Sequence, residues 1–255
     1  MEKEKTKLPA VILAAGKGTR LGKLSDNKPK PMTEVNGKMI IDNLIESLLR
    51  NGFERIIVAT GYLNEILEKT VKKYQDQAEI ICIYNPIYGT TNNIYSLWLT
   101  RKFLQNGFYL FEADVFFEDT IIQKLVGSNS ENVMLVGKHN DSMDGTVVDL
   151  NEQDKVLQMY LKRHQKQDFD FSDKYKTVNF YKIGKEFSQV FFLPKMAEHI
   201  EHEDWNSYYE LIIKEALDRG IEFSAVIAGN LKSVSYTHLR AHETVLDLVC
   251  RLLLE

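Results

Sequence analysis

The sequence has little cysteine, no long apolar run and no strong excess of charge of one sign. Its two cysteines, Cys82 and Cys250, lie far apart and outside any motif, which argues against a disulfide framework and against a zinc site. No apolar stretch approaches the length of a membrane span, and the charged start MEKEKTK does not begin a signal peptide. We therefore expect a cytoplasmic protein that does not span a membrane.

Charge and length narrow the class of protein further. With 32 basic and 36 acidic residues the formal net charge is -4, which gives no reason to expect nucleic acid as a partner. Any recognition of phosphate should therefore be local. The chain has 255 residues, 44% of them hydrophobic, enough for one large domain with its own core.

Strand and helix signals alternate in the first half of the chain. The apolar runs that indicate buried strands lie at residues 11–13, 56–60, 79–84, 108–114 and 133–137. Apolar side chains at helical spacing occur in residues 38–52, 64–74 and 92–104. This alternation predicts an α/β fold with a Rossmann-like, mainly parallel sheet covered by helices on both faces. Ligands of such sheets usually bind at the carboxyl ends of the strands.

The second half of the chain has a different pattern of strand and helix signals. Residues 144–163 indicate two strands joined by a polar turn, and residues 176–183 indicate another strand. A helix is predicted over residues 204–220, with Trp205 and Tyr208 on its apolar face. We interpret residues 138–182 as a small β-rich lid inserted into a single domain that spans residues 1–232.

The stretch AVILAAGKGTRLG, residues 10–22, joins the first strand to a loop rich in glycine. Gly16 and Gly18 allow backbone conformations in which an anion approaches the amides closely, and Arg20 is suited to gripping two phosphate oxygens. The stretch lacks the Gly-Lys-Ser/Thr end of a P-loop, and a dinucleotide fingerprint would need glycine where Leu21 stands. A simple strand-to-helix turn beside solvated lysines is the alternative without function.

The whole pattern is LAAGKGTR followed by KPKPM, and it resembles the nucleotidyltransferase family that joins nucleoside triphosphates to phosphorylated acceptors. The resemblance covers about residues 8–232. It implies that the glycine loop wraps the triphosphate and that Lys30 and Arg20 are catalytic, with Lys30 stabilising the charge that develops at the attacked phosphorus. With the end of the second strand expected near base and ribose, the residues assigned to nucleotide binding are Leu13, Ala14, Ala15, Gly16, Gly18, Thr19, Thr60, Gly61, Tyr62 and Asn93.

Asp114 ends the apolar run FYLFEAD, where a carboxylate is costly unless it is paired, exposed or bound to a cation. The resemblance implies that Asp114 binds Mg²⁺ together with the triphosphate. Glu112, two residues earlier, is expected on the same face, supporting this carboxylate. The alternative is that Asp114 only caps the following turn.

The consecutive residues Asn93, Ile94, Tyr95 and Ser96 resemble an element of the cytidylyltransferases that activate phosphocholine or 2-aminoethylphosphonate. An acceptor with an ammonium head needs aromatic faces or carboxylates, and its oxyanion needs a cation. The oxyanion is assigned to Lys176. The candidates for the ammonium head are Tyr88, Tyr95, Asp144, Tyr175 and Tyr181. For each tyrosine, ordinary core packing is the alternative.

The end of the chain, residues 233–255, departs from the family pattern and resembles a peptide translated from sequencing-adapter DNA. The resemblance leads us to expect a second metal-binding aspartate in this region, which Glu243 and Asp247 imitate only superficially. His238 and His242 are spaced like a zinc pair but lack the HExxH glutamate. We expect a non-native tail and a natural protein that continues further.

The sequence thus predicts a Mg²⁺-dependent nucleotidyltransferase that joins CTP to phosphocholine or 2-aminoethylphosphonate. Two other functions remain open. One is a sugar-1-phosphate nucleotidyltransferase that uses another nucleoside triphosphate, and the other is an inactive domain that only binds nucleotide. No residue establishes cytosine over uracil, and the sequence does not give the oligomeric state.

Overall fold

The computed structural model describes residues 6–18, 28–141, 143–228 and 234–235. Its strands are β1 (Ala10–Ala14), β2 (Glu34–Val35), β3 (Lys38–Met39), β4 (Arg55–Thr60), β5 (Glu79–Tyr84), β6 (Phe108–Glu112), β7 (Val115–Phe116), β8 (Val133–Lys138), β9 (Val147–Leu150), β10 (Val156–Tyr160), β11 (Tyr175–Ile183), β12 (Ser224–Ile227) and β13 (Val234–Ser235). Its α-helices are α1 (Ile40–Arg50), α2 (Asn64–Lys72), α3 (Asn93–Leu99), α4 (Thr120–Val126), α5 (Lys185–Phe187), α6 (Leu193–Glu201) and α7 (Glu210–Asp218). The shorter turns of helix are the 3₁₀ segments η2 (Lys30–Met32), η3 (Arg101–Phe103) and η4 (Lys162–His164), and the π-helical segment η5 (Ser188–Phe192).

A nine-stranded sheet organises the molecule, in the order β10-β9-β11-β6-β1-β4-β5, with β8 beside β11 and β12 beside β8. β1 is parallel to β4 and β6, β4 to β5, and β8 to β12. β11 is antiparallel to β6, β8 and β9, and β10 is antiparallel to β9. Within this sheet only β10 and β11 therefore run against the common direction, which confirms the predicted mainly parallel α/β fold.

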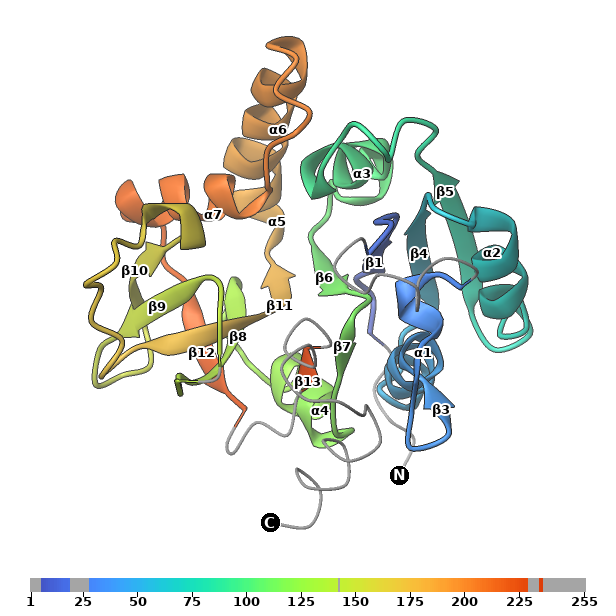
Figure 1. Cartoon of the computed structure of the whole chain (residues 1–255), viewed down its shortest axis with the longest axis horizontal. Helices are drawn as coiled ribbons and strands as arrows, with labels where there is room; N and C mark the ends of the chain where they lie inside the picture. Colours follow the sequence, from blue (N-terminus) through green and yellow to red (C-terminus); the bar gives the residue numbers. More distant parts are fainter. Residues whose placement is uncertain (1–5, 19–27, 142, 229–233, 236–255) are drawn as a thin grey trace.

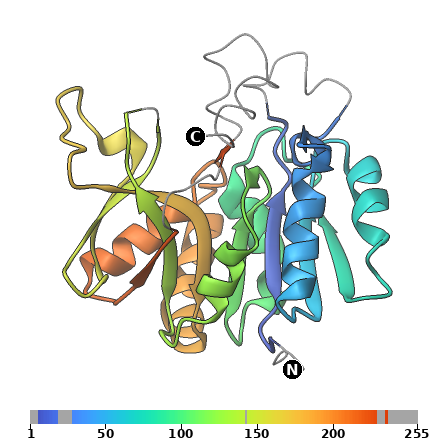
Figure 2. The same ribbon diagram turned by 90° about the horizontal axis from the view of Figure 1, so that it is seen from below.

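Alternation of side chains along the central strand produces two hydrophobic cores, one on each face of the sheet. Ala10, Ile12 and Ala14 of β1 pack with the apolar sides of α1, α2 and α4. Val11 and Leu13 point the other way and pack with α3, α6 and α7. Helices thus cover both faces (Figures 1 and 2), as the predicted layers require.

The helix predicted over residues 204–220 is shorter than expected, because α7 begins at Glu210. Trp205 belongs to the preceding turns, where its indole N–H donates to the carbonyl of Ile200 at 3.1 Å. Its own carbonyl accepts from the amide of Asn92 at 2.9 Å. These contacts secure Trp205 to the end of α6 and the start of α3, so the prediction that Trp205 and Tyr208 belong to this helix is wrong.

The ends of several strands meet at one edge of the sheet. In the parallel register Ala14 lies beside Thr60, and Leu13 lies beside Glu112, so the loops after β1, β4 and β6 start at the same level. β11 pairs with β6 only from Phe180 onward, so its first residues extend past this edge. The sheet therefore places the glycine loop, the end of β6 and the start of β11 around one region.

None of the described helices combines the length and apolar character that crossing a lipid bilayer requires.

Substitution of Gly61 tests how tightly the residues at this edge of the sheet are packed. A Cβ at this position would lie 2.5 Å from the Ala15 carbonyl oxygen and 2.8 Å from Tyr88 Cβ, whereas a Cβ at Gly89 meets nothing within 4 Å. We expect Gly61→Ala to lower the free energy of unfolding by about 1–3 kcal/mol. Gly89→Ala, the control in the loop between β5 and α3, should change it by less than about 0.5 kcal/mol. Urea unfolding measures both, and equal stability of the two variants would contradict this packing.

Candidate functional site

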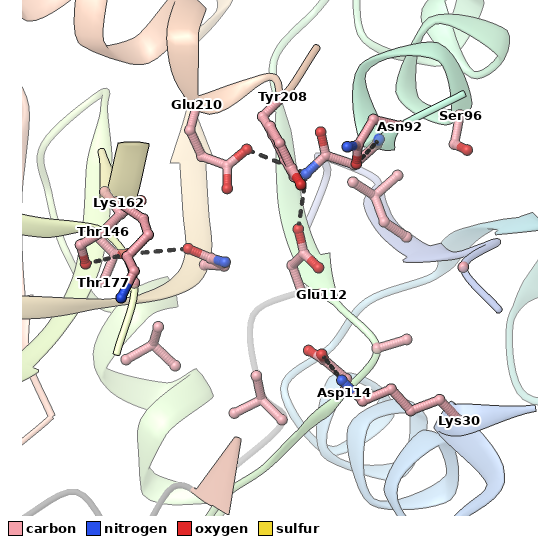
Figure 3. Close-up of a pocket in the computed structure, with 18 of the residues that line it drawn as sticks. Lys30, Asn92, Ser96, Glu112, Asp114, Thr146, Lys162, Thr177, Tyr208 and Glu210 are labelled. Atoms are coloured by element: carbon pink, nitrogen blue, oxygen red, sulfur yellow. Dashed lines mark hydrogen bonds and ion pairs between the residues drawn. The ribbon is translucent and has the colours of Figure 1, made fainter. Parts of the chain in front are cut away.

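A cavity of about 940 Å³ opens at the carboxyl edge of the central strands. Its walls come from the loop after β1, the end of β6, the starts of α3 and α7, and the first residues of β11 with the loop before β9. Figure 3 shows side chains from these separate elements pointing into the same space. Its size and mixed polar lining suit a small-molecule site.

Many residues that the sequence singled out line this cavity. From the assigned sets these are Leu13, Ala14, Ala15, Gly16, Gly18, Lys30, Tyr88, Asn93, Asp114, Asp144 and Lys176. Thr19 and Arg20 lie outside the described residues, as do the tail residues His238, His242, Glu243 and Asp247. Part of the wall is formed by residues 144–146, 161–163 and 176–179, which lie within the region 138–182 that the sequence analysis interprets as a lid.

The glycine loop and the lysine beyond it are packed against each other. Gly18 adopts a left-handed conformation, with φ of 66°. A Cβ there would lie 3.1 Å from the Cβ of Lys30, so the lysine stem needs glycine beside it. Lys30 extends its ammonium group to Asp114, with which it forms an ion pair inside the cavity. One cation and one anion from segments 84 residues apart thus meet at this wall (Figure 3).

The end of the second parallel strand supports the site from outside. Thr60 is fully buried and donates through Oγ1 to Glu68 at 3.0 Å. The amide of Tyr62 donates to the Ala15 carbonyl at 3.0 Å, and the rings of Tyr62 and Tyr88 lie 6.2 Å apart. Thr60, Gly61 and Tyr62 are therefore next to the cavity, in contact with residues that line it, but do not themselves form its wall.

Three of the predicted acceptor tyrosines pack elsewhere. Tyr181 is completely buried, with its ring centroid 5.9 Å from that of Tyr209. The ring centroids of Tyr95 and Trp205 lie 5.6 Å apart. The Lys138 Nζ atom lies over the ring of Tyr175, 4.9 Å from its centroid. The structure does not bring these rings to the cavity wall. Among the described residues, the aromatic side chains that line it are Tyr88 and Tyr208.

The structure also reveals a pair of carboxylates, of which sequence reasoning missed Glu210. Asn93 Nδ2 donates to Glu112 Oε1 at 3.3 Å and to Glu210 Oε2 at 3.2 Å, and Asn93 Oδ1 accepts from the amide of Tyr209 at 3.0 Å. The Tyr209 hydroxyl donates to Glu112 Oε1 at 3.3 Å. Asn93 thus fixes both carboxylates, which point toward each other in Figure 3. The signal that could have identified Glu210 is its position as the one acidic residue in the apolar stretch YYELII, residues 208–213.

Burial dominates the electrostatics of this pair. It raises the pKa of Glu112 to about 8, with the negative charges of Asp114 and Glu210 adding to the effect. Burial also raises the pKa of Glu210, which is 7% exposed. The free cavity therefore disfavours two full negative charges, and a bound cation would relieve that cost.

Lys176 faces the cavity from the start of β11. Its ammonium group donates to the Thr177 carbonyl at 2.8 Å and passes close to Gly145, where a Cβ would lie 3.2 Å from Nζ. Burial lowers the pKa of Lys176 to about 8, although nearby acids, led by Glu210, oppose this shift. Asp144, a predicted acceptor residue, forms an ion pair with Lys162 on the same wall. Lys176 is thus a buried cation available to an anionic ligand.

A divalent metal would find one suitable carboxylate here. Asp114 lines the cavity directly beyond β6, while Glu112 is engaged by Asn93 and Tyr209. No group of three or more His, Cys, Asp or Glu side chains within the described ranges is arranged to hold a metal ion. Mg²⁺ fits such a position, because it often takes one or two carboxylates together with substrate phosphates and water.

Comparison with known proteins agrees with this geometry. The profile of the family described as nucleotidyl transferase matches residues 9–180. A CMP-5′-(3-aminopropyl)phosphonate synthase from Streptomyces rubellomurinus is 32% identical over 212 residues, covering 83% of this chain and 34% of the relative. A choline-phosphate cytidylyltransferase from Streptococcus pneumoniae is 39% identical over 107 residues, covering 42% of this chain and 44% of the relative. The chain therefore spans less than half the length of these curated relatives.

The fold has a counterpart among solved structures. The CTP:phosphocholine cytidylyltransferase of Streptococcus pneumoniae superimposes with a TM-score of 0.77, covering 97% of this chain and 98% of that chain at 20% identity. At this identity the likeness concerns the fold.

The buried Lys176 cation predicts a dependence of stability on pH. Between the folded pKa of about 8 and the ordinary value of 10.5, the folded protein has lost this proton while the unfolded chain still binds it. The buried charge of Lys176 therefore lowers the free energy of unfolding by its full amount below pH 8. This penalty disappears as the pH rises from 8 to 10.5. We expect Lys176→Met to raise the free energy of unfolding at pH 7 by up to about 3 kcal/mol.

Lys174 is the control for this measurement. Lys174 Nζ lies 2.8 Å from Asp149 Oδ1. The hydrogen bond between these two side chains raises the pKa of Lys174, so the folded protein favours the charged form of this lysine. Lys174→Met should lower the free energy of unfolding. Urea titrations at pH 7 and pH 10 check both variants. A Lys176→Met variant less stable than the wild type at pH 7 would show that burial does not penalise this charge.

Proposed function

The chain belongs to the nucleotidyl transferase family, and on that premise we propose that it transfers a cytidylyl group from CTP to a phosphonate or phosphate that carries an amino-alcohol-type head. Pyrophosphate is the second product. The observation that carries this proposal is the meeting of Gly16, Gly18, Lys30 and Asp114 in one cavity with Lys176. The acceptor class is supported by the aminopropylphosphonate and choline-phosphate enzymes to which the chain is similar.

The nucleotide is assigned to the wall formed by the loop after β1. Gly16 has open space where a Cβ would stand, which leaves its backbone accessible to phosphate oxygens, and Gly18 adopts the left-handed conformation that lets the loop turn toward Lys30. Lys30, paired with Asp114 in the free site, lies next to Gly18 and is positioned to neutralise charge at the α-phosphorus. An entering triphosphate offers this lysine an oxyanion in place of the carboxylate.

The acceptor is assigned to the opposite wall. Its phosphonate or phosphate oxygen attacks the α-phosphorus in line, forming a new P–O bond while the bond to pyrophosphate breaks. No general base is needed, because the attacking oxygen is already ionised. Lys176 is the residue that we propose orients this oxyanion.

Asp114 is the residue that would hold Mg²⁺ in this chain. When bound, the metal would neutralise part of the charge on the triphosphate. The protein itself contributes the position of Asp114 at the end of β6, directly across from the Lys30 ammonium group.

A screen for pyrophosphate release tests the substrates. CTP, UTP, GTP and dTTP would each be combined with 2-aminoethylphosphonate, phosphocholine and glucose 1-phosphate. We expect release with CTP and one of the ammonium-bearing acceptors. Release only with glucose 1-phosphate would establish a sugar-1-phosphate nucleotidyltransferase, and nucleotide binding without release under any condition would establish an inactive binding domain.

The role of Lys30 has a separate test. We expect Lys30→Ala to lower kcat by about 10²–10³-fold, because an electrostatic stabiliser of the transition state is lost. Lys28→Ala is the matched control: Lys28 lies two residues away and pairs with Glu34 on the surface. Its kcat should change less than about twofold. Thermal unfolding shows that both variants fold, and retained turnover in folded Lys30→Ala would refute the assignment.

A further inference from the structure

We infer that Glu112 and Glu210 form the subsite that binds a primary ammonium group at the distal end of the acceptor. The enzyme then takes aminoalkyl phosphonates or phosphates in preference to trimethylammonium acceptors. This inference rests on the proposed function insofar as the acceptor occupies the same cavity.

The two carboxylates are built into the cavity wall from different elements. Glu112 ends β6, and Glu210 begins α7 and is only 7% exposed. A single amide, that of Asn93, donates to both, at 3.3 and 3.2 Å. Because Asn93 Oδ1 is itself fixed by the Tyr209 amide at 3.0 Å, the spacing of the carboxylates is set before a ligand arrives.

Neither carboxylate forms a direct ion pair. No Lys, Arg or His of the described chain lies within ion-pair distance of Glu112 or Glu210, whereas Asp114 pairs with Lys30 and Asp144 pairs with Lys162. Lys176 and Lys30 act on the two glutamates only through longer-range attraction. Hydrogen bonds from described residues reach Glu112 only at Oε1, so Oε2 keeps its acceptor capacity. Two buried acids held together without a counterion are costly, and a ligand ammonium would supply the missing charge.

The opposite charge lies in the same cavity. Lys176, largely buried, lines the wall formed by the start of β11, near enough to Glu210 for that acid to oppose the lowering of its pKa. The cavity therefore has a buried cation for an oxyanion and a pair of buried carboxyl groups for an ammonium group. That distribution matches a short zwitterion, which a sugar phosphate is not.

The lining also discriminates between types of ammonium. A quaternary ammonium group has no N–H donor and is commonly held by several aromatic faces. Here Tyr95, Tyr175 and Tyr181 pack away from the cavity, and Tyr88 and Tyr208 are the aromatic side chains among its described lining residues. Carboxylate oxygens that accept hydrogen bonds suit a primary ammonium group, which has three N–H donors.

Calorimetry with defined ligands tests the subsite without requiring turnover. The probes are 2-aminoethylphosphonate, ethylphosphonate, which lacks the amine, and phosphocholine, each with and without a nonhydrolysable CTP analogue. We expect the aminoethyl compound to bind at least tenfold more tightly than either of the others. In Glu210→Gln the advantage over ethylphosphonate should fall below threefold. Glu215→Gln changes a more exposed acid on the same helix and should retain the wild-type preference.

Each other outcome overturns the inference. These are equal affinity for 2-aminoethylphosphonate and ethylphosphonate, tighter binding of phosphocholine, persistence of the preference in Glu210→Gln, or no binding of any of the three. The wild-type comparison stands even if a variant fails to fold. Pyrophosphate release from CTP separates the two proposals: amine-dependent binding without release defeats the proposed function alone, whereas equal release with both phosphonates defeats the subsite alone.

Discussion

The common direction of β1, β4 and β6 is the constraint on which the rest of the structure depends. Parallel strands in register end at one level, so the residues that follow them lie at the same edge although they are distant in sequence. Gly18, Lys30 and Asp114 meet only because of this alignment. The antiparallel β11 adds Lys176, because it begins beyond the end of β6. The sheet thus determines which charges face the cavity.

The charges in the cavity are arranged at a cost to stability. Lys176 is buried enough to lower its pKa to about 8, and Glu112 is buried enough to raise its pKa to about 8. A protein selected for stability alone would replace such groups with apolar side chains. The two cores on either side of the sheet supply apolar burial that offsets this cost. Unfavourable burial of charge in a cavity is a common property of binding and catalytic sites.

The sequence predicted the layers of the fold well, and it singled out Gly16, Gly18, Lys30 and Asp114, which line the cavity, because both depend on local patterns. The apolar period assigned α1 and α2, and also α3, which Asn92 caps. The glycine motif and Asp114 follow directly from strands whose ends the pattern marks. These features need no knowledge of long-range contacts beyond the parallel order of the strands.

The wall that we assign to the acceptor was harder to predict, because it depends on contacts between distant segments. Tyr181 alternates into the core on β11, and nothing local distinguishes a core tyrosine from one that faces a ligand. Glu210 lines the cavity as the first residue of α7, a helix that begins later than its apolar period suggests. Asn93 stood out through the family resemblance, but its contacts with Glu112 and Glu210 become visible only in three dimensions.

The most direct test of the account is a crystal structure of the chain with a nonhydrolysable CTP analogue and Mg²⁺. The central claim is that one cavity at the carboxyl edge of the sheet holds the triphosphate. We expect phosphate density along Gly16 and Gly18, with the α-phosphate within hydrogen-bond distance of Lys30 Nζ and the metal at Asp114. A triphosphate bound away from these residues, at another surface of the molecule, would contradict it.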